Sequence, residues 1–501
     1  MAFLDWIMRL VGVEVVPAKA RHKGAEASGA RTGAAAGSSA PQAAHKAAHE
    51  AVPQATAHAT AKAADTAEPA ADTADGVVRV LVAELRNDRQ NAFTGRLTQA
   101  LDQARVVQVR PSPRVPRALG AQTAADLAAL QSEAAELLTA ERADVLIAGS
   151  LSKTTMRLRL VPAEPPPAAR LDAFVPSDSL LLPPNFDARH ATLAYASVLA
   201  AALPSRPAHR ATLITHIASA ADQCRGLLES AGDDDGHGDD APPPDHLASQ
   251  MTHLGVVSGV AWRGSGRPDL LQAAADAYRR AAADGPKEVA PAMLAGLRIR
   301  LGLALQEQAA ESGDEALLTE AAEAFEKVAA ALDANTHGTD WATAQQCLGD
   351  LLAKRGHRES NARFCADAVD AFDDALNVFT KEAHRGRWMD LMSLRGGAYL
   401  TWGSLEAGAR RLQASVDIYR QVLDTRNQDT APLQWAQAAN NLGSAAFALA
   451  KRTSDGAMLN EAAGAYDGAL AVYQRLGHKR GMEVLRGNLQ RVERLRARAA
   501  G

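Results

Sequence analysis

Small and aromatic positions recur every 47 residues along the second half of the chain, from residue 247 onward. One column is a glycine that follows leucine or arginine, and it consists of Gly255, Gly302, Gly349, Gly396 and Gly443. A second column is aromatic and consists of Tyr278, Phe325, Phe372, Tyr419 and Tyr466. A small residue stands four positions before each aromatic residue, and an alanine or valine stands three positions after it. This five-fold repeat predicts a stacked array of similar structural units.

The spacing inside each repeat predicts two helices. The small residue, the aromatic residue and the alanine or valine fall at i, i+4 and i+7, which places all three on one helix face. The glycine belongs to the preceding helix and lets the second helix approach closely. One such hairpin cannot bury these faces alone, whereas five stacked hairpins can. Residues 482–500, in which leucines alternate with arginines, are expected to close the array as a capping helix.

These columns resemble the tetratricopeptide repeat (TPR), a family of helical hairpins with small and aromatic residues at the same internal offsets. The resemblance covers residues 247–480, but each unit has 47 residues where the family uses about 34. Longer helices and longer end loops are therefore expected. The predicted fold is mainly α: a TPR-like α-solenoid of five helical hairpins over residues 247–501, preceded by a small N-terminal α/β domain.

The first helix of each hairpin lines a concave groove in TPR arrays, which implies where a partner would bind. In repeats three to five the matching positions are polar, and they are Gln346, Asp350, Lys354, Asp390, Ser393, Gln437, Asn440 and Ser444. We expect a peptide or helix of a protein partner to bind there; an ordinary solvated face is the alternative. In repeats one and two the matching positions are apolar, at Val256, Val260, Ile299 and Leu303. That end of the groove is expected to be covered, and helices predicted within residues 187–228 are candidates to cover it.

The pattern between residues 77 and 162 changes to short apolar runs, which predict strands. The predicted strands occupy residues 77–83, 106–109, 144–150 and 155–161, and the predicted helices occupy residues 93–104 and 124–142. Strands and helices in this order predict a small α/β layer. Two further helices within residues 185–230 are expected to bridge this layer to the repeats.

The order of these elements, with the segments LTQAL and ADVLIAGSL, resembles the amino-terminal domain of TolB-type proteins. In that family the domain is an interaction or scaffolding module, usually in the periplasm. This chain departs from the family because residues 1–16 do not have the form of an export signal. They have no basic stretch before the apolar one, and Asp5 and Arg9 interrupt the apolar residues.

Residues 1–16 are instead predicted to form an amphipathic docking helix, followed by a disordered alanine-rich tether over residues 17–76. The apolar residues of the helix fall on one arc, and they are Phe3, Leu4, Trp6, Ile7, Leu10 and Val11. This face is expected to bind a second protein, a membrane surface or the chain's own body. A lone arginine on the polar face favours protein over membrane. Residues 231–246 are expected to be a solvated linker, because their aspartates lack the spacing of a calcium-binding loop.

Composition and motifs argue against nucleic-acid binding, a membrane span and the common catalytic sites. The net charge of −4 shows no signature of nucleic-acid binding, and no apolar stretch is long enough to span a bilayer. Three widely spaced cysteines are expected to be buried thiols, which fits a cytoplasmic protein. No phosphate loop, nucleophile elbow or metal-ligand spacing occurs. Residues with reactive side chains, namely Ser150, Lys153, His216 and His253, are interpreted as structural.

The sequence therefore predicts a non-enzymatic scaffold or adaptor without cofactor, metal or nucleic-acid partner, located in the cytoplasm or at the periphery of a membrane. Its partners are expected to be proteins bound at the groove and at the docking helix. Two alternatives remain: a peripheral membrane organiser anchored by the docking helix, and a ligand sensor built on the α/β domain.

Overall fold

The computed structural model describes residues 76–88, 91–102, 106–116, 124–164, 170–175, 178–226, 244–284 and 291–500. The described residues fall into two compact units, one within residues 64–348 and the other within residues 349–501, and each unit is described by itself. The docking helix expected at residues 1–16, the tether up to residue 75 and the acidic stretch 233–240 lie outside the described residues.

The unit within residues 64–348 contains a five-stranded sheet with the strand order β2-β1-β3-β4-β5. Its strands are β1 (Val78–Val82), β2 (Val107–Pro111), β3 (Val145–Leu151), β4 (Met156–Pro162) and β5 (Leu180–Leu182). β1 is parallel to β2 and β3, whereas β4 is antiparallel to both β3 and β5. The four strands predicted from the sequence are confirmed. The sequence pattern misses β5, because three leucines after a proline-rich stretch are too short a run to indicate a strand.

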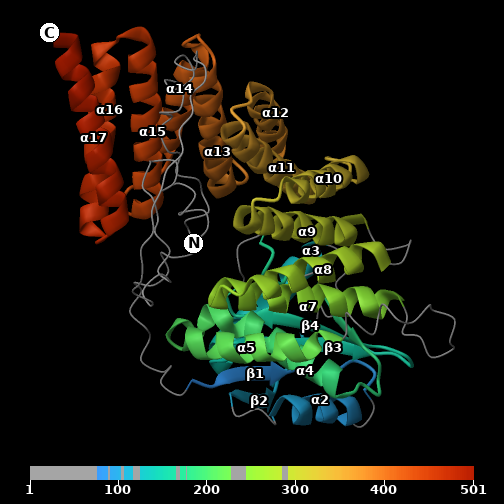
Figure 1. The fold of residues 1–501 in the computed structure, drawn as a ribbon. Coiled ribbons are helices and arrows are strands. Elements are labelled where there is room, and N and C mark those ends of the chain that lie inside the picture. The colour runs from blue at the N-terminus through green and yellow to red at the C-terminus, as the bar shows by residue number, and fades with distance from the viewer. Residues whose placement is uncertain are drawn as a thin grey trace, which may run out of the picture. The chain divides into compact units, whose positions relative to one another are not determined.

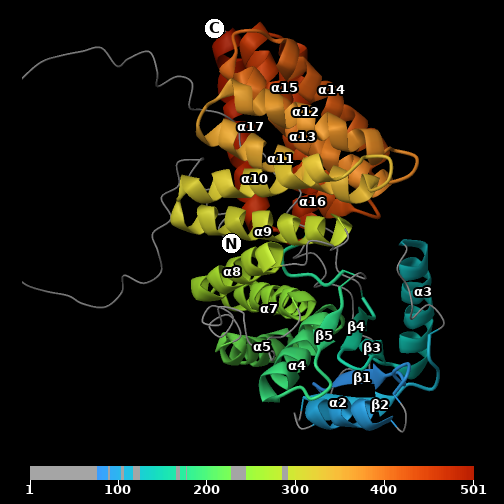
Figure 2. The same cartoon turned by 90° about the vertical axis from the view of Figure 1, so that its right-hand side faces the viewer.

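Helices cover both faces of this sheet (Figure 2). The helices that contact it are α2 (Ala92–Asp102), α3 (Ala124–Glu141), α4 (Ala188–Ala202) and, at β5, α7 (Pro244–Ser265). Because alternate residues of a strand face opposite sides, Leu81 and Leu146 pack with Leu138 of α3. The neighbouring residue Val80 is also fully buried, on the face where α4 contacts the strands. Both faces of the central strands are therefore part of a core, which explains their uninterrupted apolar runs.

α4 and α5 (Arg210–Cys224) form a hairpin that packs against α7 (Pro244–Ser265), the first helix of the first repeat. Ile214 of α5 lies directly against Gly264 of α7, where a larger side chain would collide with it. The hairpin therefore stacks on the first repeat as a further pair of helices, in the bridging position that the sequence predicts.

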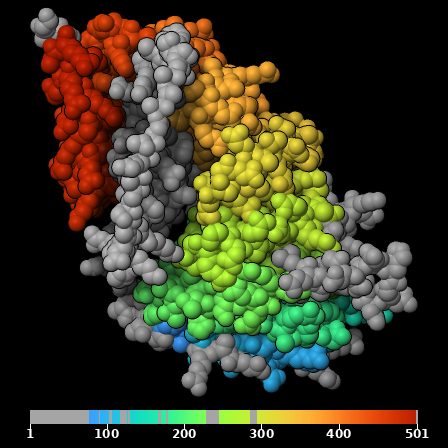
Figure 3. Space-filling view, in the orientation of Figure 1, coloured from blue at the N-terminus to red at the C-terminus, as the bar shows by residue number. Residues whose placement is uncertain are grey.

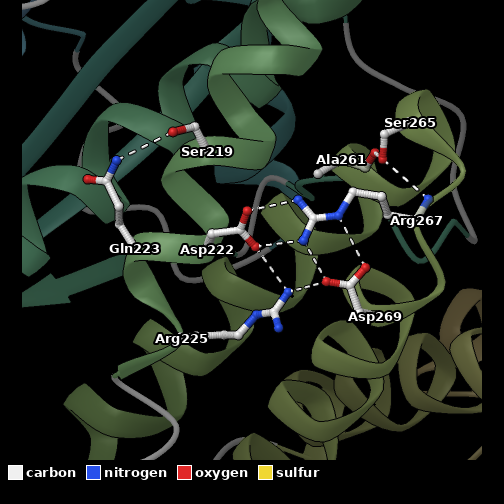
Figure 4. A network of polar contacts seen from close by, with 8 residues as sticks. All are labelled: Ser219, Asp222, Gln223, Arg225, Ala261, Ser265, Arg267 and Asp269. Atoms are coloured by element: carbon white, nitrogen blue, oxygen red, sulfur yellow. Dashed lines mark hydrogen bonds and ion pairs between the residues drawn. The ribbon is translucent and has the colours of Figure 1, made fainter.

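A ring of two arginines and two aspartates joins the same hairpin to the start of α8 (Pro268–Asp284) (Figure 4). Arg267 contacts Asp222 and Asp269 at 2.5 to 3.1 Å, and Arg225 contacts the same two carboxylates at 2.6 and 3.0 Å. Hydrogen bonds from Arg267 and Arg225 lower the pKa of Asp269. The four side chains are 36 to 45% exposed, so the ring orients the two elements more than it stabilises them.

The remaining helices form the predicted hairpins and a final helix (Figure 1). They are α9 (Pro291–Ser312), α10 (Glu315–Ala331), α11 (Gly338–Arg358), α12 (Ala362–Val378), α13 (Arg385–Leu405), α14 (Arg410–Thr425), α15 (Pro432–Thr453), α16 (Gly456–Arg475) and α17 (Lys479–Ala500). The first helix of each hairpin has 21 or 22 residues and the second has 16 to 20. The fold is mainly α with a small α/β domain, as predicted, and long helices account for the long repeat.

Each repeat has the same seam between its two helices. The glycine column contacts the aromatic column in all five hairpins, and a methyl group added at any of these glycines would lie 2.5 to 3.0 Å from the ring. The five aromatic side chains are at most 1% exposed. The mechanical role that the sequence assigns to these columns is therefore confirmed: glycine permits the close approach, and the ring fills the space.

α17 closes the second unit as the expected capping helix. Leu485 and Val492 are fully buried against α15 and α16, and Leu489 packs beside them. The opposite face of α17 carries Arg486 and Arg494, both exposed, and Figure 3 shows this helix in red at an outer edge of its unit. A buried stripe with a charged outer face is what the end of a helical array requires.

Candidate functional site

Part of the proline-rich stretch between β4 and α4 lies along α7, and we call residues 170–175 and 178–182 the docked segment. Its last three residues are β5, which lies beside α7 (Figure 2). The segment meets successively earlier turns of α7, so it runs antiparallel to that helix. The contacting pairs, in order along the segment, are Leu171 with Gly259, Phe174 with His253, and Leu181 with Ser249.

Side chains of α7 hydrogen-bond the main chain of the docked segment. Ser249 Oγ donates to the carbonyl oxygen of Ser179 at 2.6 Å and accepts from the amide of Leu181 at 2.8 Å. Gln250 Nε2 donates to the carbonyl oxygen of Leu181 at 3.2 Å. These contacts to main-chain groups do not depend on which side chains the segment carries.

Tyr278 of α8 connects the docked segment to the core of the first repeat. Its ring packs against Gly255 in the repeat seam, and its hydroxyl donates to the carbonyl oxygen of Leu171. Burial raises the pKa of Tyr278, so the hydroxyl keeps its proton and remains a donor. The same aromatic column thus stabilises the hairpin and holds the segment.

Two arginines of the first helices bind carboxylates of the docked segment. Arg263 Nε lies 2.6 Å from Asp172, which is also held by Arg170 of the segment itself. Arg300 of α9 contacts both carboxylate oxygens of Asp178 at 2.6 and 3.2 Å, and the two side chains are only 5 and 8% exposed. Burial alone would raise the pKa of Asp172, but the charges of Arg263 and Arg170 outweigh burial and hold the pKa below its ordinary value. The Asp172 carboxylate is therefore an ionised partner of Arg263 and Arg170.

His253 lies at the centre of this surface and is 1% exposed. Its ring centroid is 4.8 Å from that of Phe174, and its Nδ1 lies 3.0 Å from Ser197 Oγ of α4. Its Nε2 has no hydrogen-bond partner among the described residues. Burial lowers the pKa of His253 to about 4, with Asp178 raising it and Arg300 lowering it further. The imidazole is therefore neutral at pH 7, as a structural histidine should be.

The apolar positions of the first two repeats are buried, as expected, and a second stretch of chain joins the expected helices at α7. Val256, Val260 and Ile299 are at most 5% exposed, and Leu303 is half-buried. The helices expected within residues 187–228 pack against α7 through residues such as Ser197 and Ile214, and the docked segment, which precedes them in the chain, also lies along α7. The sequence carries one overlooked signal of this contact: two arginines, Arg298 and Arg300, interrupt the apolar residues between Leu297 and Leu301.

Of the predicted partner-binding residues in the unit within residues 349–501, Asp350, Lys354 and Asp390 pair with charged side chains. Asp350 is 8% exposed in its side chain and contacts Lys354 at 2.6 Å, one turn later on α11. Asp390 of α13 is 45% exposed and accepts a hydrogen bond from Arg426 at 2.9 Å. Ser393 is half-buried and its hydroxyl donates to the carbonyl of Met389. The structure thus brings Asp350 and Lys354 together.

Two other predicted residues are buried inside this unit. Asn440 accepts a hydrogen bond from Asn488 of α17 at 3.3 Å and donates to Asn441 at 3.4 Å. Ser444 Oγ donates to the Asn440 carbonyl oxygen at 2.9 Å and lies 3.2 Å from the hydroxyl of Tyr466. Both side chains serve internal contacts in this structure, which the projected groove pattern does not anticipate.

The other two predicted residues stand apart. Gln437 of α15 is half-buried. Gln346 belongs to the unit within residues 64–348, is half-buried, and its Oε1 has no hydrogen-bond partner among the described residues. The repeat pattern therefore identifies polar positions on the first helices, but it does not distinguish half-exposed positions from positions that are buried within the array.

The other residues with reactive side chains lie in a strand, in a turn or in the core. Ser150 lies in β3 and Lys153 in the turn that follows. All three cysteines are buried, and burial raises the pKa of Cys224 and Cys365 to about 12. Within the described residues, His, Cys, Asp and Glu nowhere gather in a group that could hold a metal ion. None of the described helices combines the length and the apolar character needed to cross a membrane.

The chain matches no protein-family model, and no curated protein matches it. Among solved structures it is similar to one described as "Circular tandem repeat protein with novel repeat topology and enhanced subunit contact surfaces", at 14% sequence identity. The similarity covers 62% of this chain and 85% of that chain, with a TM-score of 0.25. A likeness of this degree transfers no function to this chain.

Proposed function

We propose that this chain is a non-enzymatic scaffold that binds proteins through the first helices of its TPR-like repeats. One observation carries the proposal: α7, α8 and α9 hold a largely irregular stretch of polypeptide through main-chain hydrogen bonds and two arginine–carboxylate contacts. Surfaces that grip main-chain groups and add a few charged contacts are typical of peptide recognition. The proposed partners are extended peptides or helices of other proteins.

A second proposed surface lies on the first helices of the unit within residues 349–501. Its half-exposed members are Lys354, Asp390, Ser393 and Gln437, and Asp350 orients Lys354. These side chains offer one cation, one anion and neutral hydrogen-bonding groups, which suits a polar peptide. The predicted docking helix at residues 1–16 is proposed as a further attachment point for a protein, in the cytoplasm or at a membrane.

Affinity capture followed by mass spectrometry tests this function. The full chain is compared with a Lys354→Glu/Gln437→Lys variant and with an Arg486→Glu/Arg494→Lys variant, whose substitutions lie on the exposed face of α17. We expect a defined set of proteins to bind the wild type and the α17 control and to lose at least about tenfold in yield with the first variant. Equal capture by all three proteins would contradict the second surface. Turnover of a nucleotide or peptide substrate by the purified chain would contradict the scaffold.

The docking helix has a separate test. Deletion of residues 1–16 is expected to remove part of the captured set while leaving the repeats folded by circular dichroism. Liposome sedimentation of the full chain distinguishes the alternatives, because a membrane organiser must bind vesicles and a protein adaptor need not. Unchanged capture together with no lipid binding would show that this helix has neither role.

A further inference from the structure

We propose that the surface of α7, α8 and α9 is a peptide-binding site that the chain keeps occupied with its own docked segment. Its partner in trans is a peptide with two carboxylates six residues apart and an aromatic residue two positions after the first, which turns before the second carboxylate as the chain does between Val175 and Asp178. In this chain those positions are Asp172, Phe174 and Asp178. The inference rests on the scaffold function proposed above and names the class of partner for one of its surfaces.

The contacts divide into general and selective ones, as in a ligand site. Ser249, Gln250 and Tyr278 bond only main-chain groups of the docked segment, so their contacts do not depend on which side chains a peptide in this path carries. Arg263 and Arg300 bind the two carboxylates and set the spacing. The ring of Phe174 packs on that of His253 between them. A competing peptide must satisfy the same three selective contacts.

Arg300 shows why the carboxylates matter. The Arg300 side chain is only 5% exposed. A buried cation without an anionic partner destabilises the folded state by several kcal/mol. A seam that only stabilised the fold would do as well with apolar residues of similar volume. A buried arginine on this surface instead selects an anionic group, whether it comes from Asp178 or from a partner.

The docked segment can leave without breaking the sheet. Residues 170–175 belong to no helix or strand, and β5 has only three residues at the edge of the sheet. The strands β2, β1, β3 and β4 keep all of their mutual pairings when β5 is removed. The cost of opening is the loss of the β4–β5 pairing and the exposure of the segment's buried side chains, Leu171, Ala173, Phe174, Leu180, Leu181 and Leu182. A peptide that buries equivalent side chains and pairs with β4 returns this cost.

A tethered segment competes with a free peptide at an effective concentration that is commonly in the millimolar range. The wild-type chain should therefore bind such a peptide weakly, and weakening the segment should raise the affinity. The test uses a fluorescein-labelled peptide with the sequence of residues 170–182, RLDAFVPSDSLLL. The full chain and its Asp172→Asn/Asp178→Asn variant are titrated against it by fluorescence anisotropy, with folding checked by circular dichroism.

We expect the double variant to bind the labelled peptide at least about tenfold more tightly than the wild type, because Arg263 and Arg300 remain available. A peptide with asparagine at both aspartate positions should lose most of that gain. Asp222→Asn, which alters an exposed carboxylate on α5 outside this surface, is the matched control and should behave as wild type. Equal affinity of the folded double variant and the wild type would overturn the proposal.

A second measurement uses the wild type alone and so does not depend on the folding of the variant. A peptide with benzoylphenylalanine in place of the residue equivalent to Phe174 is photo-crosslinked at millimolar concentration, and the adducts are mapped by mass spectrometry. Adducts on α7 around His253 support the site, and their absence from α7 overturns it. Because the capture experiment above alters other residues, failure of the peptide site and failure of the scaffold function give different results.

Discussion

The first helices α7 and α15 use the same repeat geometry but satisfy their polar side chains in different ways. On α7, Ser249 and His253 contact chain from outside the repeats, namely the docked segment and α4. Asn441 stands four repeat lengths after His253, and together with Asn440 it belongs to an amide network within the repeats that reaches α17. The repeat columns therefore determine the hairpin seam. The other positions of the first helices differ between repeats: on α7 they contact chain from outside the repeats, and on α15 they make internal contacts.

The two surfaces should differ most in how much stability they lose when an arginine is removed, because the ion pair at the docked segment is buried. Arg300→Met leaves the carboxylate of Asp178 buried without its cationic partner, which should lower the free energy of unfolding by about 3–5 kcal/mol. Arg420→Met in the other unit removes a half-exposed contact with Glu461 and should cost no more than about 1 kcal/mol. Urea unfolding of both variants measures the two values. Equal losses would remove the energetic contrast between the two surfaces.

The two surfaces should also differ in how their stability depends on pH. Of the two, the α7 surface is the one with a buried neutral histidine, His253, at its centre. The unfolded chain binds a proton on His253 below its ordinary pKa of 6.5, whereas the folded chain does so only near pH 4. The free energy of unfolding should therefore fall as pH drops from about 6.5 to 4, by roughly 3 kcal/mol from this group. His253→Asn should flatten that part of the profile, and His216→Gln, a half-buried residue of α5, should not. An unchanged acid profile in His253→Asn would contradict a neutral buried imidazole.

Glycine-to-alanine substitutions in the hairpin seam should destabilise both units to a similar degree. The glycine and aromatic columns meet in the same way in all five hairpins. Gly302→Ala and Gly443→Ala each force a methyl group against a buried ring and should each cost about 1–3 kcal/mol. Gly296→Ala on α9 has open space around it and should stabilise by up to about 1 kcal/mol through helix propensity. Thermal unfolding of the three variants gives the comparison. A large cost at only one seam position would show that the two regions differ in more than their grooves.

The smallest expected effect separates internal packing from ligand binding on α15. Asn440→Ala removes two amide contacts, one of them to Asn488, and should lower the free energy of unfolding by about 1 kcal/mol. It should leave the binding of the labelled peptide unchanged in the anisotropy assay. A change in peptide affinity without a change in stability would reassign Asn440 to a binding surface.

The sequence predicts most of the fold because its strongest signals come from local periodicity. The glycine and aromatic columns specify the hairpins, and apolar runs specify four of the five strands. The candidate site could be predicted only in part, because its key contacts join residues far apart in the chain, such as Asp178 and Arg300. The burial of Asn440 and Ser444 also depends on neighbouring helices, which a single helix pattern does not contain.

Hydrogen exchange of the wild-type chain tests most directly whether the docked segment is a ligand of the repeats. The amide of Leu181, which donates to Ser249 Oγ, is compared with the amides of Val80 and Val82 in β1. We expect Leu181 to exchange through a partial opening with a free energy at least about 2 kcal/mol below that of β1, and added RLDAFVPSDSLLL peptide should favour this opening. Exchange of Leu181 and β1 at one common free energy, insensitive to the peptide, would contradict the account and make the docked segment a permanent part of the core.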